Sequence, residues 1–258
     1  MSDFNWKKMV SNFDARRDLL IPGNKEQTID FCVKQLIQIG QEAIHLRGSF
    51  FLALSGGSTP NAIFKKVGQS PYKEELDWSK VYLFWSDERS VPPIDKENNY
   101  YNGMQAGLSL LPIPSTNIYR MQAEENIEEN ALAYEKLIKQ KVPHNSFDLV
   151  MLGMGEDGHT ASLFPETHGL HTNDRLVIAN YVPQKSTWRM SLTYECIHLA
   201  KQIIIYVLGK EKAFTVKQVL TEKEQPNHYP IQRIGTPTQK ALWILDSSAS
   251  HELLSSID

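Results

Sequence analysis

The 258-residue sequence predicts an α/β protein, built as a doubly wound, mainly parallel sheet with helices on both faces. Apolar runs of strand length alternate with segments in which apolar residues recur every three or four positions. Most of the runs consist of Val, Ile, Leu and Phe without polar alternation, which is typical of strands covered on both faces. Because parallel strands need crossover connections, this alternation indicates right-handed βαβ units.

Seven apolar runs are expected strands, and they are residues 50–54, 81–85, 147–152, 176–182, 190–193, 202–208 and 241–245. Helical spacing is clearest from Ile29 to Ile44 and from Ile127 to Ile138. No linker or repeat divides the chain, so we expect a single domain of residues 1–258 around one sheet. The polar, proline-containing segment 221–238 is expected to be a long loop, and its role is not assigned.

Composition argues against several partner classes. The chain has 27 Lys and Arg against 30 Asp and Glu, a formal charge of −3, with no long block of either sign, so a nucleic-acid partner is not expected. The apolar runs are far shorter than the roughly 20 residues that cross a bilayer, and the first residues lack the apolar stretch of a secretory signal. Cys32 and Cys196 stand alone without CxxC spacing and are expected to be buried thiols in a reducing cytoplasm. The oligomeric state stays open between monomer and homodimer.

Ligands of such sheets bind at the carboxyl ends of strands, so the loops after the apolar runs are the place to look. The first loop reads SGGSTP, in which Gly56 and Gly57 allow close approach of the backbone and Ser58 and Thr59 supply hydroxyls and possible helix caps. Pro60 suits the first helical position. Free N–H groups at that helix start would favour a phosphate, although a well-capped turn explains the same residues. The nucleotide pattern GxxxxGK[ST] is absent, so a phosphorylated small molecule is preferred over ATP.

The second loop places Asp87, Glu88 and Arg89 directly after a buried run. Charges at this position are unfavourable unless they are paired or used on a ligand. Either carboxylate could bridge to Arg89 or cap a neighbouring helix, and Asp87 is also a candidate for substrate binding. Arg89 is the stronger functional candidate, because a fixed guanidinium can stabilise developing negative charge.

The third loop, GMGEDGHT, allows two interpretations. Gly153, Gly155 and Gly158 match the dinucleotide pattern GxGxxG after a strand. Against that interpretation, Pro165 cuts off the long helix that the pattern requires, and Asp174 precedes an apolar run instead of ending one. The dinucleotide reading is therefore the less favoured one.

The favoured interpretation uses the side chains of the same loop. His159 can take a proton from water, and Asp157 can orient its ring. His168 and His171 could add to a metal site, but their spacing lacks a matching third ligand, so we expect surface histidines and no metal.

Two basic residues follow further along the chain. Arg189 lies at the start of one expected strand and Lys212 lies in the turn after another. Both could be solvated surface residues. Together with Ser58 and Thr59 they could instead complete a phosphate clamp, with Arg189 binding in a bidentate manner and Lys212 acting as a point charge.

The motifs SGGSTP, WSDERSVP, FDLVMLGMGEDGHTASLFP, RMSLT and GKEKA occur in this order, and together they resemble the 6-phosphogluconolactonase family. The resemblance implies a Rossmann-like fold shared with glucosamine-6-phosphate deaminases. It also implies hydrolysis of 6-phospho-glucono-1,5-lactone in the oxidative pentose phosphate pathway, on a small-molecule sugar-phosphate lactone and without a metal or organic cofactor.

By the same resemblance, His159 corresponds to the general base, Asp157 to its companion and Arg89 to the arginine that stabilises the reacting centre. The residues that resemble the family's phosphate-binding set are Gly57, Ser58, Thr59, Arg189 and Lys212.

The sequence differs from the lactonase pattern at one position and from the deaminase pattern at another, and two alternative functions remain. Asn98 stands where many members have Ser, which puts one minor loop contact in doubt. The deaminases carry DGHIAFNEP where this chain has DGHTASLFP, so their acidic residue is missing here. A deaminase or isomerase would use Asp87 and His159 in ring opening and proton transfer. A non-catalytic sugar-phosphate sensor would keep the phosphate clamp but has no reason to retain Asp157 with His159.

Overall fold

The structure is a computed structural model that describes residues 4–255. Its larger sheet has seven strands in the order β1-β2-β10-β9-β6-β3-β4. These strands are β1 (Ser11–Asn12), β2 (Arg17–Leu20), β3 (Phe50–Leu54), β4 (Val81–Trp85), β6 (Leu149–Leu152), β9 (Ile203–Val207) and β10 (Ala241–Leu245). All neighbours are parallel except β1 and β2. Every residue of β3, β6, β9 and β10 is buried, as expected for strands covered on both faces.

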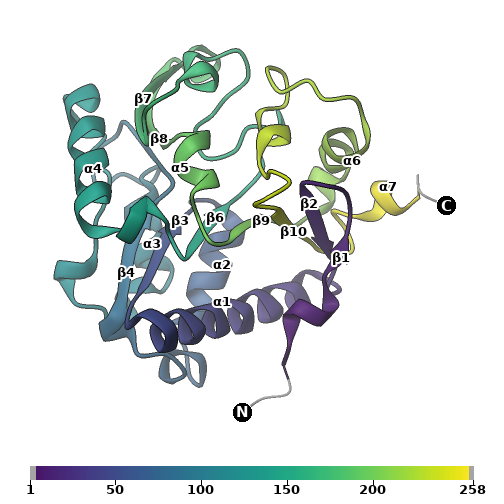
Figure 1. The fold of residues 1–258 in the computed structure, drawn as a ribbon, viewed down its shortest axis with the longest axis horizontal. Coiled ribbons are helices and arrows are strands. Elements are labelled where there is room, and N and C mark those ends of the chain that lie inside the picture. Colours follow the sequence, from purple (N-terminus) through teal and green to yellow (C-terminus); the bar gives the residue numbers. More distant parts are fainter. Residues whose placement is uncertain (1–3, 256–258) are drawn as a thin grey trace.

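The α-helices are α1 (Lys25–Arg47), α2 (Ser58–Val67), α3 (Asn99–Ala106), α4 (Ile127–Lys141), α5 (Tyr194–His198), α6 (Ala213–Thr221) and α7 (His251–Leu254). Figure 1 shows α1 and α2 on one side of the central strands and α5 and α6 on the other. The predicted α/β class with a mainly parallel sheet is confirmed. The longest helix, α1, begins with a capping box formed by Asn24 and Gln27 and ends at Gly48 in the left-handed region.

A second sheet, which the sequence did not predict, contains β5 (Asp87–Arg89), β8 (Thr187–Leu192) and β7 (Val177–Val182) in that order, all antiparallel. The prediction of one sheet was therefore wrong. Only the short turn η8 (Pro183–Lys185) and Ser186 separate β7 from β8. A connection of that length cannot cross over to a parallel position, so the two strands form a hairpin.

The order of the larger sheet fixes where a cavity can form. From β3 the chain moves outward to β4, whereas β6 lies on the opposite side of β3. The loops after β3 and β6 therefore leave the sheet where the strand order reverses, which is where open α/β sheets bind ligands. A Cβ atom built at Gly153, after β6, would lie 4.0 Å from Ser55 Oγ, after β3. The two loops are thus direct neighbours.

The two cysteines lie in the environment that the sequence predicts. Cys32 and Cys196 are both buried and both free of disulfides, as predicted. Within residues 4–255, no helix is both long enough and apolar enough to span a membrane.

Candidate active site

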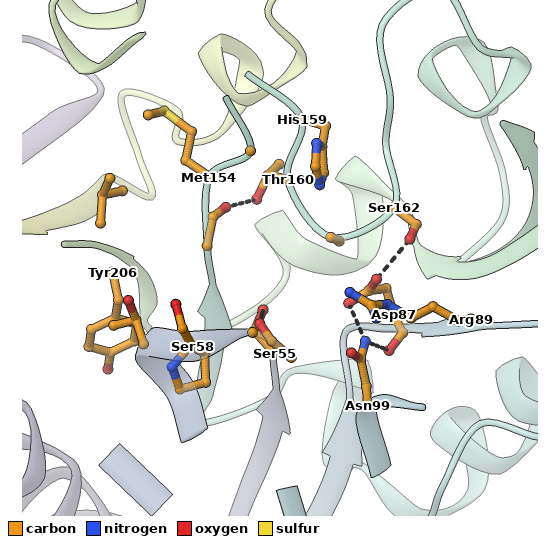
Figure 2. A pocket seen from close by; sticks show the side chains of 18 of the residues that line it. Ser55, Ser58, Asp87, Arg89, Asn99, Met154, His159, Thr160, Ser162 and Tyr206 are labelled. Atoms are coloured by element: carbon orange, nitrogen blue, oxygen red, sulfur yellow. Dashed lines mark hydrogen bonds between the residues drawn. The ribbon is translucent and has the colours of Figure 1, made fainter. Parts of the chain in front are cut away.

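A cavity of about 420 Å³ opens at the carboxyl ends of β3, β6 and β9 and is bordered by the second sheet. The predicted site residues that line it are Gly56, Gly57, Ser58, Thr59, Asp87, Arg89, His159, Arg189 and Lys212. Asp157 contributes through His159 without lining the cavity itself. Figure 2 shows His159 and Thr160 on one side, facing Ser58 and Asp87 on the other.

The first loop enters α2 earlier than predicted. Gly57, at φ +110°, is the residue before the helix, so Ser58 and Thr59 are its first two residues and Pro60 the third. The backbone N–H groups of Ser58 and Thr59 belong to the first turn and lack intrahelical acceptors. They stand at the positive end of the helix dipole, on the wall of the cavity, where an anion is favoured.

The third loop is a compact turn that its own hydrogen bonds close. Gly155 N donates to His159 O at 2.9 Å, and Gly158 N donates to Gly155 O at 3.1 Å. Thr160 Oγ1 donates to Gly153 O at 2.8 Å, as drawn in Figure 2. A Cβ at Gly155 would lie only 2.1 Å from His159 Nδ1. The close packing of the His159 ring therefore explains this glycine without a dinucleotide.

His159 and Asp157 form a hydrogen-bonded pair. Asp157 Oδ1 lies 2.5 Å from His159 Nδ1, and the Phe164 ring stacks on the imidazole with centroids 3.9 Å apart. Burial has the largest single effect and raises the pKa of Asp157, but the hydrogen bonds and the charge interaction with His159 together outweigh it and bring the pKa below its ordinary value. An ionised Asp157 accepts the proton of Nδ1, which leaves Nε2 of the neutral ring as a proton acceptor.

Asp87 is held by side chains from two other elements. Ser162 Oγ donates to its Oδ2 at 2.7 Å, and Asn99 Nδ2 donates to its Oδ1 at 3.2 Å (Figure 2). A Cβ at Gly56 would lie 1.9 Å from Asn99 Oδ1, so the absence of a side chain there makes room for this network. Asp87 thus links α3 to the segment that follows the third loop, and Asn99 packs against the first loop at Gly56.

Glu88 points the other way along β5, as alternation in a strand requires. It is fully buried and accepts hydrogen bonds from the backbone N–H groups of Arg89, Asn99 and Tyr100 at 2.7 to 2.9 Å. Burial raises its pKa to about 7 despite these donors. The alternative that one of the two carboxylates caps a helix is therefore right for Glu88, which caps the start of α3 together with Asn98.

Arg89 and Arg189 lie directly opposite each other on β5 and β8. Like charges in this register repel, and burial together with Arg89 lowers the pKa of Arg189. Arg89 has a partial partner in Glu97, through a hydrogen bond to its carbonyl at 2.7 Å and a carboxylate at 3.8 Å. Among residues 4–255, neither Nε atom has a hydrogen-bond partner. Two opposed guanidinium groups on a cavity wall make a strong anion site.

Lys212 ends the turn η9 (Lys210–Lys212) and precedes α6, with Nζ 4.0 Å from Glu156 Oε1. The cavity also includes Glu97, Asn99 and Lys185, which the sequence analysis did not select. Lys185 is an exposed turn residue, and no local pattern distinguishes it from other surface lysines.

His168 and His171 lie on the exposed turn η7 (His168–His171), outside the cavity. In the part of the chain that the structure describes, no three His, Cys, Asp or Glu side chains gather as a metal site.

Comparison with known proteins identifies the family of this chain. Residues 23–243 match the family described as glucosamine-6-phosphate isomerases/6-phosphogluconolactonase. A 6-phosphogluconolactonase of Chlamydia pneumoniae is 40% identical over 91% of this chain and 90% of its own length. One of Haemophilus influenzae is 35% identical over 82% of this chain and 92% of its own. The crystal structure of 6-phosphogluconolactonase from Thermotoga maritima superposes with a TM-score of 0.74 at 26% identity, covering 90% of this chain and 99% of that one. The chain therefore belongs to the family of glucosamine-6-phosphate isomerases and 6-phosphogluconolactonases.

Proposed function

We propose that this chain hydrolyses 6-phospho-D-glucono-1,5-lactone to 6-phospho-D-gluconate, the lactone-opening step of the oxidative pentose phosphate pathway. The observation that carries the proposal is the Asp157–His159 pair on the cavity that Arg89, Arg189 and the α2 N-terminus also line. An ionised partner on Nδ1 prepares His159 to act as a base. The surrounding cations suit a substrate that carries a phosphate and develops an oxyanion.

The phosphate is held by the first loop and two basic side chains. The N–H groups of Ser58 and Thr59 supply donors at a helix N-terminus. Arg189 offers a planar guanidinium for bidentate contact, and Lys212 adds a point charge beside α6. With the phosphate fixed, the lactone carbonyl lies over the third loop, so the reacting groups are brought together before the chemical step.

His159 then carries the proton transfers. Its Nε2 removes a proton from water as the water oxygen attacks C1, and the carbonyl electrons move to the oxygen. Arg89 stabilises this oxyanion. When the tetrahedral intermediate collapses, the bond between C1 and the ring oxygen breaks and protonated His159 gives its proton to that oxygen. Asp157 keeps the ring oriented and stabilises its charged form through the 2.5 Å contact to Nδ1. The products are the free acid and the unchanged enzyme.

The test is lactone opening by His159→Ala. Loss of a general base lowers kcat by roughly 10²- to 10⁴-fold, and we expect a decrease of this size with little change in KM. His171→Ala is the matched control, because His171 is exposed and lies outside the cavity. Activity of His159→Ala within a few-fold of the parent would exclude His159 as the base. Supplying glucosamine 6-phosphate in parallel tests the deaminase alternative, since only that reaction releases ammonia.

A further inference from the structure

The long loop that the sequence left without a role contacts the catalytic turn. We call residues 225–234, which include the turn η10 (Pro230–Arg233), the strap. Ile231 N donates to Gly158 O at 3.0 Å, and Asn227 O accepts from Glu166 N at 3.1 Å. The strap therefore binds the third loop at Gly158 and the segment after it at Glu166, so one contact lies on each side of His159 along the chain.

The first of these points lies between the two residues of the catalytic pair. Gly158 separates Asp157 from His159 and adopts φ +73°, a left-handed conformation that favours glycine. A Cβ built there would lie 2.7 Å from Tyr229 Cδ1 and 3.2 Å from Tyr229 Cα. Tyr229 is partly buried against the core, so it forms a firm wall behind the turn. A side chain at position 158 would therefore clash with Tyr229, so the turn and the strap pack closely at this glycine.

The second point lies next to the ring that stacks on His159. Glu166 follows Phe164 by two residues, and Phe164 packs face to face against the imidazole. Holding Glu166 N on Asn227 O therefore fixes the end of the loop that carries this stacking partner. The two side chains that orient His159, the carboxylate of Asp157 and the ring of Phe164, thus lie one and two residues from the points that the strap holds.

The strap is itself tied to the body of the protein. Tyr194 Oη, on α5, donates to Pro230 O at 2.8 Å. Gln232 is 1% exposed and donates through Nε2 to Val219 O on α6 at 3.3 Å. Arg233 Nη1 donates to Leu170 O at 2.6 Å. Because its anchors come from separate elements, the strap passes the rigidity of the core to the third loop.

We propose that the strap positions the catalytic pair, and that Tyr229 is the positioning residue that acts through Gly158 on Asp157 and His159. The inference rests on the proposed function of His159 as the base. The phosphate-binding groups lie on α2 and β8 and before α6, outside the loop that the strap contacts. Loosening the strap therefore lowers kcat and leaves KM unchanged.

The experiment compares Tyr229→Ala with Tyr229→Phe, which keeps the ring edge and the Cβ that face Gly158. Misplacing a catalytic group by about 1 Å can lower the rate about 100-fold. We expect Tyr229→Ala to lose about 10- to 100-fold in kcat with KM within about twofold, and Tyr229→Phe to restore the parent kcat. Tyr229→Leu, which keeps an apolar side chain, gives an intermediate kcat and replaces Tyr229→Ala if that variant does not fold. Lys223→Ala, an exposed change just outside the strap, is the control.

A second measurement needs no substrate. The proton on His159 Nδ1 that is shared with Asp157 is followed by NMR in the parent and in each variant. We expect its resonance to shift or broaden in Tyr229→Ala and to stay unchanged in Tyr229→Phe and Lys223→Ala. An unchanged resonance together with an unchanged kcat in Tyr229→Ala overturns the positioning role. If the parent itself does not open the lactone, the proposed function fails, and the NMR comparison still decides whether the strap orients the pair.

Discussion

The two sheets contribute to the cavity in different ways. The larger, parallel sheet ends below the cavity, and it supplies backbone N–H groups and the Asp157–His159 pair from the loops that follow β3 and β6. The smaller, antiparallel sheet borders the cavity with the strands themselves, so Arg89 and Arg189 project from residues inside β5 and β8. Under the proposed function, the loops of one sheet perform proton transfer, whereas the strands of the other hold charge.

This difference has an energetic consequence. The Asp157–His159 pair is satisfied within the third loop, since Asp157 Oδ1 lies 2.5 Å from His159 Nδ1. The two arginines are only partly satisfied. They oppose each other, both Nε atoms lack partners among the described residues, and Arg89 is bound only through Nη1 to Glu97. The smaller sheet is therefore held in a conformation that an anion would stabilise.

After the loss expected for His159→Ala, the largest effect is expected from Arg189→Ala. Losing a hydrogen bond to a charged group removes up to about 3 kcal/mol, so KM for the lactone should rise about 100-fold with a smaller change in kcat. Because the change also relieves the repulsion with Arg89, the unliganded variant should unfold at a temperature no lower than the parent.

Steady-state kinetics measures the change in KM. Thermal unfolding with and without inorganic phosphate measures the stability of the variant and its loss of phosphate binding. The parent should gain more from phosphate than Arg189→Ala does, since the variant has lost part of the binding site. Arg189→Lys, which keeps a charge but not the planar fork, should fall between them. A variant that unfolds well below the parent and responds equally to phosphate would show that Arg189 is structural.

A smaller effect is expected in the loops of the larger sheet, from Asp157→Asn. The amide can no longer fix the proton on His159 Nδ1 by charge, so kcat should fall about 10-fold while KM stays unchanged. Glu156→Gln is the matched control, because it removes the same charge from the neighbouring, largely exposed position. Equal kcat values for the two variants would mean that Asp157 does not act on His159.

The same comparison explains what the sequence could predict. Long apolar runs identified the strands of the parallel sheet, and the rule that ligands bind at their carboxyl ends selected the loops that carry Ser58 and His159. Both lie on the cavity. The pairing of Asp157 with His159 was also predictable, because two residues of separation in a glycine-rich turn let the side chains meet.

The smaller sheet was harder to predict because its strands depend on partners that are distant in the sequence. β5 has only three residues and pairs with β8, about a hundred positions later. Nothing local distinguishes the buried helix cap Glu88 from Asp87, which faces the cavity. The contact of Tyr229 with Gly158 is likewise a tertiary contact, so segment 221–238 could be recognised only as a loop.

Glu88 and Asp157 provide the finest test of the comparison between the two sheets. The net effect of the surroundings raises the pKa of Glu88 and lowers the pKa of Asp157. Burial raises the pKa of Glu88 to about 7, above its ordinary 4.5. Burial acts the same way on Asp157, but its hydrogen bonds and charge interaction with His159 together outweigh burial, and the pKa falls below 3.8. Between about pH 4.5 and about pH 7, the folded protein therefore keeps a proton on Glu88 that the unfolded chain has released.

The free energy of unfolding should accordingly fall as pH rises through this window, by at most about 1.4 kcal/mol per pH unit, the contribution of one proton. Urea unfolding between about pH 5 and about pH 8 measures the slope, and Glu88→Gln should remove the part that Glu88 contributes. If the slope is the same in the variant, Glu88 is already ionised in the folded protein. Its three N–H donors would then hold a charge inside the smaller sheet as effectively as His159 holds the charge of Asp157 in the loop.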